Sequence, residues 1–364
     1  MLTRAYTIRF NTPAFLGNAD QDGQWRTPPI KALLRQWWRV AFAADQTGAV
    51  DMGAMRAAEG KLFGVAADRD GDSRKSEVRI RLNRWDKGSL SSWTGQEQGV
   101  ALVTHREVKR NGQVTPVSSQ LYLGYGPLKL AQGQTSLKAR AAIQAVEHAV
   151  LSLAIPSGAE EATRLDTALS LMHRYGTLGG RSRNGWGSFS LTPIDASTPE
   201  LKADLDARLT SHWQDALGLD WPHAIGTDVG SDGKQVRPLI WQTEALVDWK
   251  AVMRRLAEIK ISLRVQFIFP DVQPPHPQPL ARHWLAYPIT KHATLAWDRN
   301  ARLPNSLRFK VRADADGKLR GVIFHVPCLP PPQFKPNLAA IQTVWRQVHA
   351  HLDHADRKLT RIPA

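Results

Sequence analysis

Stretches in which apolar and polar residues alternate recur in both halves of the chain, between stretches of helical spacing, and this limits the fold to a mixture of strands and helices. Alternation predicts strands, among them those at residues 6–10, 149–155, 307–311 and 319–326. Apolar residues spaced by three and four predict helices at residues 160–175 and 337–354. Because each half of the chain offers strands and helices, we expect an α+β protein with two domains.

The length of 364 residues is sufficient for two domains, each with its own hydrophobic core. We place an N-terminal domain at residues 1–192 and a C-terminal domain at residues 261–364. Residues 193–260 are expected to form a helical connector or insertion, with one helix near residues 198–217. The C-terminal domain is expected to begin with a strand at residues 263–269, where apolar side chains alternate.

Residues 27–41 carry the clearest helix signals in the sequence. Thr27 is the predicted N-cap, and the two prolines after it fall in the first turn, where a missing N–H costs little. Three cations recur every four residues and form a row along one face of this helix; this basic row is Lys31, Arg35 and Arg39. Because like charges at this spacing repel each other, a polyanion lying along the helix would stabilise it.

The charge balance of the chain favours a polyanionic partner. It has 48 Lys and Arg against 33 Asp and Glu, a formal net charge of +15 and a pI near 10.2. A field of this sign attracts nucleic acid or an anionic surface. The chain also contains 13 Trp, whose rings can stack on bases, although most tryptophans serve as core. Spacing alone does not decide whether Trp37 or Trp38 is core, and we take Trp38 as the candidate for ligand contact.

Residues 176–187 form a glycine-rich loop that could bind phosphate. Its glycines allow a close approach of the backbone to a ligand, and its amides could turn outward. Arg181 and Arg183 supply bidentate donors for phosphate, Ser182 adds a hydroxyl, and Trp186 offers a stacking plane. The loop lacks the spacing of a nucleotide-binding P-loop or of a dinucleotide fingerprint. Together with the basic row, it favours a nucleic-acid backbone over a small anion.

Four segments together resemble a known family, and they lie at residues 10–17, 26–39, 62–64 and 179–189. The second reads Arg-x-Pro-Pro-Ile-Lys-x-Leu-Leu-Arg-x-Trp-Trp-Arg, and the last reads Gly-Gly-Arg-Ser-Arg-Asn-Gly-Trp-Gly-Ser-Phe. With these motifs the chain resembles the RAMP proteins of type III CRISPR effectors. The closest match is the first-numbered RAMP subunit of the Cmr (type III-B) complex.

The resemblance implies two tandem ferredoxin-like (RRM-like) domains with insertions. It also implies a non-catalytic subunit at the head of the complex, near the 3′ end of the guide RNA (crRNA), beside other RAMP subunits. Such a subunit would help to bind the guide and capture target RNA in antiviral defence, without a cofactor. The implied RNA-binding residues are Lys31, Arg35, Trp38, Arg39, Gly179, Gly180, Arg181, Ser182, Arg183, Asn184 and Trp186.

Two catalytic alternatives and one non-RNA alternative stay open. The resemblance places Asp20 and Asp22 in the loop where the backbone subunits of these complexes carry a catalytic aspartate, so metal-dependent cleavage of target RNA is one alternative. Guide processing by general acid–base chemistry is another, with His105 or His173 as the candidate. The third is a basic scaffold without an RNA role.

The sequence predicts a cytoplasmic protein without a metal site. Its one cysteine, Cys328, excludes a disulfide within the chain and a zinc site built from several thiolates. Residues 1–6 lack the apolar region of a signal peptide, and no apolar run is long enough to span a bilayer. Three histidines near the end, His349, His351 and His354, lack the further ligands that zinc requires.

Overall fold

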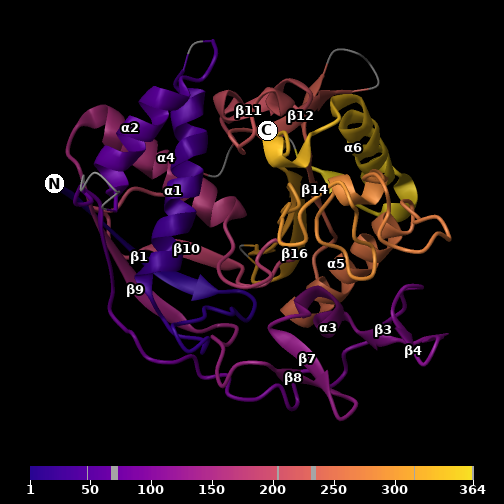
Figure 1. The fold of residues 1–364 in the computed structure, drawn as a ribbon. Coiled ribbons are helices and arrows are strands. Elements are labelled where there is room, and N and C mark those ends of the chain that lie inside the picture. Colours follow the sequence, from indigo (N-terminus) through magenta and orange to yellow (C-terminus); the bar gives the residue numbers. More distant parts are fainter. Residues whose placement is uncertain (47, 67–72, 203–204, 231–234, 315, 363–364) are drawn as a thin grey trace. The chain divides into compact units, whose positions relative to one another are not determined.

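The computed structural model describes residues 1–364 except 47, 67–72, 203–204, 231–234, 315 and 363–364. The described residues form two compact units, each containing helices and mainly antiparallel sheets, so the predicted α+β class is confirmed (Figure 1). Unit 1 consists of Met1–Gln98, Gly124–Leu209 and Lys310–Gly317. Unit 2 consists of Gly99–Leu123, Thr210–Phe309 and Lys318–Ala364.

Unit 1 is built on a four-stranded antiparallel sheet with the order β10-β1-β9-β2. Its strands are β1 (Leu2–Phe10), β2 (Arg79–Leu82), β9 (His148–Ile155) and β10 (Phe189–Pro193). Its helices are α1 (Thr27–Ala44), α2 (Met52–Phe63) and α4 (Ala159–Tyr175). Along the chain, α1 and α2 lie between β1 and β2, and α4 lies between β9 and β10. The sheet and its helices therefore follow a β-α-β-β-α-β connection with the order 4-1-3-2.

The core of unit 1 follows from the alternation in its central strands. Ile8 of β1 is fully buried and lies opposite Ala149 of β9 and Leu191 of β10. Figure 1 shows α1, α2 and α4 gathered on the same side of this sheet. The apolar stripe of α1 packs against α4, where the rings of Trp37 and Tyr175 lie 5.9 Å apart.

Unit 1 also contains a separate hairpin. It is formed by β7 (Leu128–Ala131) and β8 (Gln134–Leu137), which lie between β2 and β9 along the chain.

Unit 2 contains a second four-stranded sheet, with the order β15-β16-β14-β17. Its elements are β14 (Ile240–Gln242), α5 (Trp249–Arg264), β15 (Leu307–Ala313), β16 (Leu319–His325), α6 (Leu338–Asp353) and β17 (Thr360–Arg361). These six elements again follow a β-α-β-β-α-β connection with the order 4-1-3-2. The strands predicted at residues 307–311 and 319–326 and the helix predicted at residues 337–354 are therefore confirmed as β15, β16 and α6. Strand β15 begins in unit 2 and ends in unit 1.

Several smaller elements complete the described structure. A three-stranded sheet of unit 2 consists of β11 (Thr210–His212), β12 (Ile225–Val229) and β13 (Val236–Pro238). Short elements between residues 99 and 124 are β3 (Leu102–Val103), β4 (Lys109–Arg110), β5 (Gln113–Val114), β6 (Val117–Ser118) and α3 (Ser119–Gly124). The 3-10 turns are η1 (Ala207–Leu209), η2 (Asp215–Gly218), η3 (Ala281–Trp284), η4 (Pro332–Phe334) and η5 (Ala355–Arg357).

The compact units differ from the domain ranges predicted at 1–192, 193–260 and 261–364. The segment 193–260 is not a helical connector, because its described residues hold β11, β12, β13 and β14 as well as most of α5. The predicted helix near 198–217 is wrong; within its described part, β11 pairs in parallel with β12. The predicted strand at 263–269 is also wrong, because Leu263 extends the helical spacing of α5 and the helix includes it. Four apolar residues at alternate positions are too few to distinguish a strand from the end of a helix.

Lys310 explains why residues 310–317 belong to unit 1. Its side chain is fully buried, and Nζ donates to the carbonyl oxygens of His173 and Gly176, the latter at 2.9 Å. These carbonyls belong to the last turn and the C-cap of α4, where a helix has acceptors without intrahelical donors. The amino group of Lys310 thus satisfies the end of α4 from a strand more than a hundred residues away.

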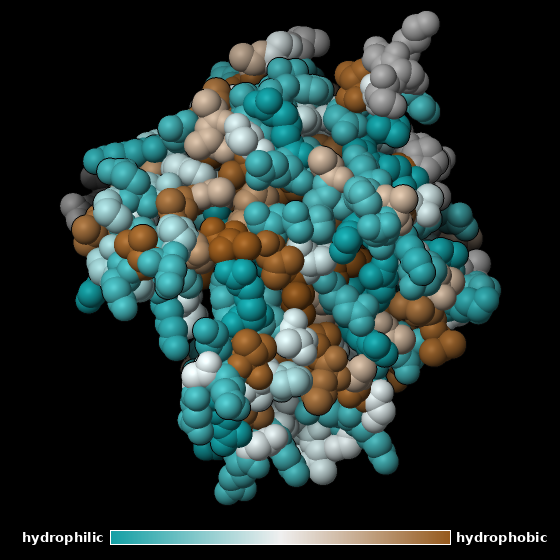
Figure 2. All heavy atoms as spheres, turned by 90° about the vertical axis from the view of Figure 1, so that its right-hand side faces the viewer, coloured by the Kyte–Doolittle hydropathy of each residue, from teal (hydrophilic) through white to brown (hydrophobic). Residues whose placement is uncertain are grey.

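The surface seen in Figure 2 is largely hydrophilic, with hydrophobic residues in separate groups among the polar ones. Among the described residues, none of the helices combines the length and the apolar character needed to cross a bilayer.

Candidate nucleic-acid interface

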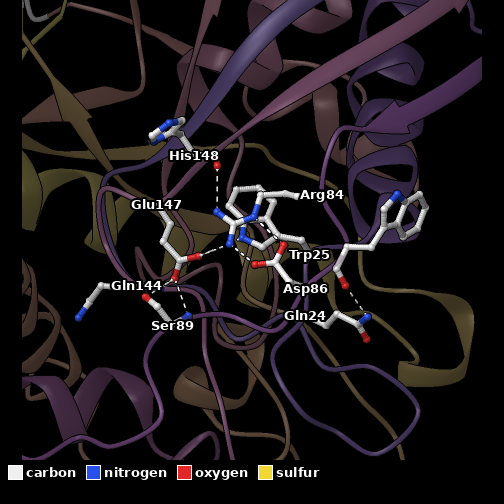
Figure 3. A network of polar contacts seen from close by, with 9 residues as sticks. Gln24, Trp25, Arg84, Asp86, Ser89, Gln144, Glu147 and His148 are labelled. Atoms are coloured by element: carbon white, nitrogen blue, oxygen red, sulfur yellow. Dashed lines mark hydrogen bonds and ion pairs between the residues drawn. The ribbon is translucent and has the colours of Figure 1, made fainter.

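Helix α1 is positioned by its buried face rather than by a side-chain cap. Its N-cap is Arg26, in an extended conformation and without a capping side-chain hydrogen bond, so the predicted capping role of Thr27 is wrong. Thr27 is the first helical residue, and a proline occupies the first turn as expected. The segment before α1 is held by Glu147, which accepts a hydrogen bond from Trp25 Nε1 at 3.1 Å (Figure 3).

Glu147 is the centre of the polar network in Figure 3. Its Oε1 accepts from the amide and hydroxyl of Ser89 and from the amide of Gln144, and Arg84 lies 3.5 Å from its Oε2. Burial would raise the pKa of Glu147, but these hydrogen bonds lower it overall. The carboxylate therefore stays charged at neutral pH and fixes three segments of unit 1 beside the start of α1.

The basic row is neutralised in part by a carboxylate that the sequence analysis did not identify. Glu59 of α2 is buried, and its Oε1 accepts from Nε of Arg35 and from Nε of Arg39, the latter at 2.7 Å. Arg39 Nη2 adds a bond to Oε2 at 3.0 Å. Burial would raise the pKa of Glu59, but the two arginines lower it overall. Glu59 thus offsets the repulsion that we expected a polyanion to offset.

The cations of the basic row remain partly accessible. The side chains of Arg35 and Arg39 are 41 % and 36 % exposed, and Lys31 is half-buried. Burial, with a smaller contribution from Arg35, lowers the pKa of Lys31. This face of α1 therefore combines a structural role with a residual positive surface.

The two tryptophans proposed for base stacking are core residues. Trp38 is fully buried, against the rings of Phe42 and Phe63. Trp186 is also fully buried, 5.2 Å from the ring of Phe15 and 5.7 Å from that of Trp93. Neither presents a ring face to solvent, so both assignments are corrected. The helical spacing of α1 places both of its tryptophans inward because its apolar stripe is wide.

The glycine-rich loop is anchored to unit 1 at its base. Gly180 N donates to Phe15 O at 3.0 Å, and Gly187 N donates to Pro13 O at 2.9 Å. The hydroxyl of Thr12 donates to Gly185 O and accepts from Ser188 N, at 2.9 and 3.0 Å. The segment after β1 therefore holds both ends of the loop.

Gly187 shows why this loop needs glycine. Its φ is +64°, and a Cβ atom there would lie 1.9 Å from Leu178 O. Other loop amides are used within the loop itself, since Asn184 N donates to Arg181 O and Gly185 N to Ser182 O. The expectation that the loop turns its amides outward is therefore corrected for Gly180, Asn184, Gly185 and Gly187.

The accessible part of the loop is its tip. Arg181 is exposed, and Gly179, Gly180, Ser182, Arg183 and Asn184 are partly exposed. The tip thus presents two guanidinium groups, one hydroxyl and one amide in a short turn, which together can bind phosphate oxygens.

The basic row and the loop tip both belong to unit 1. The first residue of the loop, Gly176, lies against Leu33 of α1, whose Cδ2 is 3.0 Å from where a Cβ of Gly176 would be. Leu33 is two positions from both Lys31 and Arg35, so it points from another face of the helix than the basic row. The base of the loop therefore contacts α1 on its apolar side.

Of the two carboxylates proposed for metal-dependent cleavage, that of Asp22 is used in the fold. Asp22 is buried, accepts from Arg140 N at 2.9 Å and lies 3.3 Å from Lys87 Nζ. The backbone bond from Arg140 is the main cause of its lowered pKa. Asp20 is exposed in a turn where its amide donates to Asn18 Oδ1. Among the described residues, no group of three or more His, Cys, Asp or Glu side chains is placed to hold a metal ion.

The histidines proposed for guide processing are poorly suited to proton transfer. His173 Nδ1 accepts from Leu191 N at 2.9 Å, and burial, followed by Lys310 and Arg312, lowers its pKa to about 3. His105 is buried in unit 2, and burial lowers its pKa to about 4. Both are neutral at pH 7 and far from the pKa that a general acid or base needs.

Comparison with known proteins gives matches among solved structures alone. No protein-family model matches the chain, and no curated protein matches it. Two solved structures match with 13 % sequence identity and a TM-score of 0.44. One is apo Cmr1 from Pyrococcus furiosus, and the match covers 99 % of this chain and 98 % of that chain. The other is a type III-B Cmr-beta complex bound to cognate target RNA, and the match covers 95 % of this chain and 99 % of that chain. A type IV-B CRISPR complex also matches, over 57 % of this chain and 96 % of that one, at 11 % identity and a TM-score of 0.31.

One exposed residue beside the loop was missed in the sequence. Tyr125 follows α3, and its carbonyl oxygen accepts a hydrogen bond from Arg181 Nε at 2.5 Å. The sequence does contain a signal for a binding role of Tyr125. This tyrosine stands between two glycines, in a stretch (residues 108–146) that contains no Asp or Glu. Its neighbour in space, however, is 56 residues away in the chain, and only the fold reveals it.

Proposed function

We propose that this protein is a non-catalytic RNA-binding subunit of a type III-B CRISPR (Cmr) ribonucleoprotein. In this role it binds near the 3′ end of the guide RNA at the head of the complex and helps to capture target RNA. The proposal rests on the four sequence segments that resemble the RAMP family and on the charge of +15.

The observation that carries the proposal is the accessible loop tip with Arg181 and Arg183. The tip is positioned by backbone bonds at its base, so little order must be gained when a phosphate binds. The repeated β-α-β-β-α-β connection with the order 4-1-3-2 supports two tandem ferredoxin-like domains as part of the same proposal.

A non-catalytic role is supported by the side chains that could otherwise act. Asp22 is held by Arg140 and Lys87, and His173 has its Nδ1 engaged and a pKa lowered to about 3. Incubation of the assembled complex with matched target RNA tests this role. The fragments should be identical with wild-type protein and with Asp22→Asn, and loss of a specific cut in the variant would contradict the proposal.

The RNA-binding role is tested by salt titration of single-stranded RNA binding to the full chain. The double variant Arg181→Ala, Arg183→Ala should weaken binding and lower the slope of log K against log salt by about one to two, since each lost phosphate contact removes about one unit or slightly less. The matched control is Arg299→Ala, Arg302→Ala, which removes the same charge from exposed positions of unit 2. Equal slopes for the two double variants would reject the loop as the contact.

The basic row needs its own variant, because Arg35 and Arg39 also bind Glu59. Lys31→Ala, which leaves that ion pair intact, should lower the slope by about one if the row contacts RNA. An unchanged slope would restrict the proposed contact to the loop tip.

A further inference from the structure

Tyr125 is an exposed aromatic residue in direct contact with the loop tip. It is 63 % exposed, so its ring is accessible to a ligand. We propose that Tyr125 and the adjacent Arg181 form a platform on which one unpaired base of single-stranded RNA stacks while Arg181 binds its phosphate. This proposal rests on the RNA-binding function proposed above.

The guanidinium of Arg181 lies along the backbone that carries Tyr125. Its Nε donates to Tyr125 O, and a Cβ atom built on Gly126 would lie 3.4 Å from its Nη2. Gly126 has φ +120°, a conformation that L side chains rarely adopt, and its amide donates to Leu128 O at 2.9 Å. These contacts therefore fix the guanidinium of Arg181 beside the backbone of the residue that carries the exposed ring.

The segment that carries Tyr125 packs on the glycine-rich loop at two further points. A Cβ atom on Gly180 would lie 3.0 Å from Pro127 Cγ, and one on Gly124 would lie 3.1 Å from Trp186 Nε1. Trp186 is buried and cannot itself stack on a base, but its ring packs against this segment. Because the ring is mounted on a packed backbone, binding a base costs little ordering of the protein.

The charges around the platform favour a polyanion. Neither residues 124–146 nor residues 167–194, the two stretches of unit 1 that meet here, contain an Asp or Glu. Exposed cations in these stretches are Lys129, Lys138, Arg140 and Arg181. An aromatic ring beside a cation in such a field is the arrangement by which proteins bind single-stranded nucleic acid, because every base has a face that can stack.

Binding of a short fluorescein-labelled oligouridine to the full chain tests the platform. Tyr125→Ala and Tyr125→Leu should both weaken binding about fivefold or more, the loss expected for one stacked base, whereas Tyr125→Phe should keep most of the affinity. The salt slope should not change in these variants, because no cation is removed. The matched control is Trp85→Ala, since Trp85 is another exposed aromatic residue of unit 1, beside the acidic Asp86.

Abasic nucleotides locate the contact. One nucleotide of the oligouridine at a time is replaced by an abasic one. Wild-type protein should bind one of these oligonucleotides more weakly than the intact oligouridine. Tyr125→Ala should bind that oligonucleotide and the intact one equally, because the variant already lacks the ring on which the base stacks.

Three results would overturn the platform. Wild-type affinity in Tyr125→Ala, with weakened binding in Arg181→Ala, would reject the platform while the proposed RNA-binding function stands. Wild-type affinity in Tyr125→Leu would show that an apolar surface, not stacking, is used. Polyglutamate that competes as strongly as oligouridine, and only when Tyr125 is present, would assign the site to an acidic protein partner. A wild-type chain that binds no RNA would reject both proposals.

Discussion

Nε of Arg39 in α1 lies 2.7 Å from Oε1 of Glu59 in α2, and the same oxygen accepts from Nε of Arg35. A buried carboxylate thus joins two cations that the sequence presents as a surface stripe. Variants of the basic row therefore change folding as well as any ligand contact, and the two effects must be separated experimentally.

Removal of both arginines should destabilise the protein through Glu59. Arg35→Ala, Arg39→Ala leaves a buried carboxylate without its partners, which costs on the order of 3 kcal/mol in the free energy of unfolding. Adding Glu59→Leu to this double variant should recover most of that loss, and urea denaturation measures both. If the triple variant were no more stable than the double variant, Glu59 would not be the cause.

The pH dependence of the same cluster has a defined sign. The pKa of Glu59 is lower in the folded state than in the unfolded state, so its contribution is present above the unfolded pKa of about 4.3 and is lost as pH falls below it. Glu59→Gln should therefore be less stable than wild type at pH 7, and this difference should shrink below pH 4. A constant difference across this range would contradict the ion pair.

Lys310→Met should destabilise unit 1. Loss of the amine leaves the carbonyls of His173 and Gly176 without a buried donor, at an expected cost of about 1–3 kcal/mol. Burial lowers the pKa of Lys310 well below its usual value, so the unfolded state binds the proton more tightly and wild-type stability rises as pH increases toward 10. The difference between wild type and Lys310→Met should grow between pH 7 and pH 10, and thermal unfolding at both values checks it.

His173→Asn should make the protein less sensitive to acid. The pKa of His173 is lowered to about 3, so the unfolded state binds a proton that the folded state does not, and stability falls as pH drops below about 6.5. Asparagine can still accept from Leu191 N and does not titrate. Between pH 7 and pH 5 the variant should lose about 2 kcal/mol less than wild type in urea denaturation. Equal losses would contradict the assignment.

Two glycines with positive φ should respond differently to alanine. Gly187→Ala places a methyl group 1.9 Å from Leu178 O and should cost more than about 2 kcal/mol, with weaker RNA binding because the loop moves. Gly133→Ala, at φ +80° in the β7–β8 turn, meets nothing within 4 Å and should cost only about 1 kcal/mol. Similar denaturation midpoints for the two variants would show that the loop is not held by this close contact.

The fold class was predictable because its signals are local. Alternation at residues 6–10 and 149–155, and helical spacing at 160–175, concern neighbours in the chain, and the structure has β1, β9 and α4 there. The strand predicted at residues 263–269 was wrong because a short run of apolar residues fits both a strand and the end of a helix. The unit boundaries could not be predicted because Lys310 binds the end of α4 across 134 residues.

The sequence by itself determined the positive charge, the helix with its basic row and the glycine loop with two arginines, because each depends on composition or on short spacing. The tertiary structure alone decided which of these side chains remain available. Burial removed Trp38 and Trp186 from contact with a ligand, Glu59 neutralised part of the basic row, and folding placed Tyr125 against Arg181. Exposure and pairing depend on residues far apart in the chain, so no local pattern could specify them.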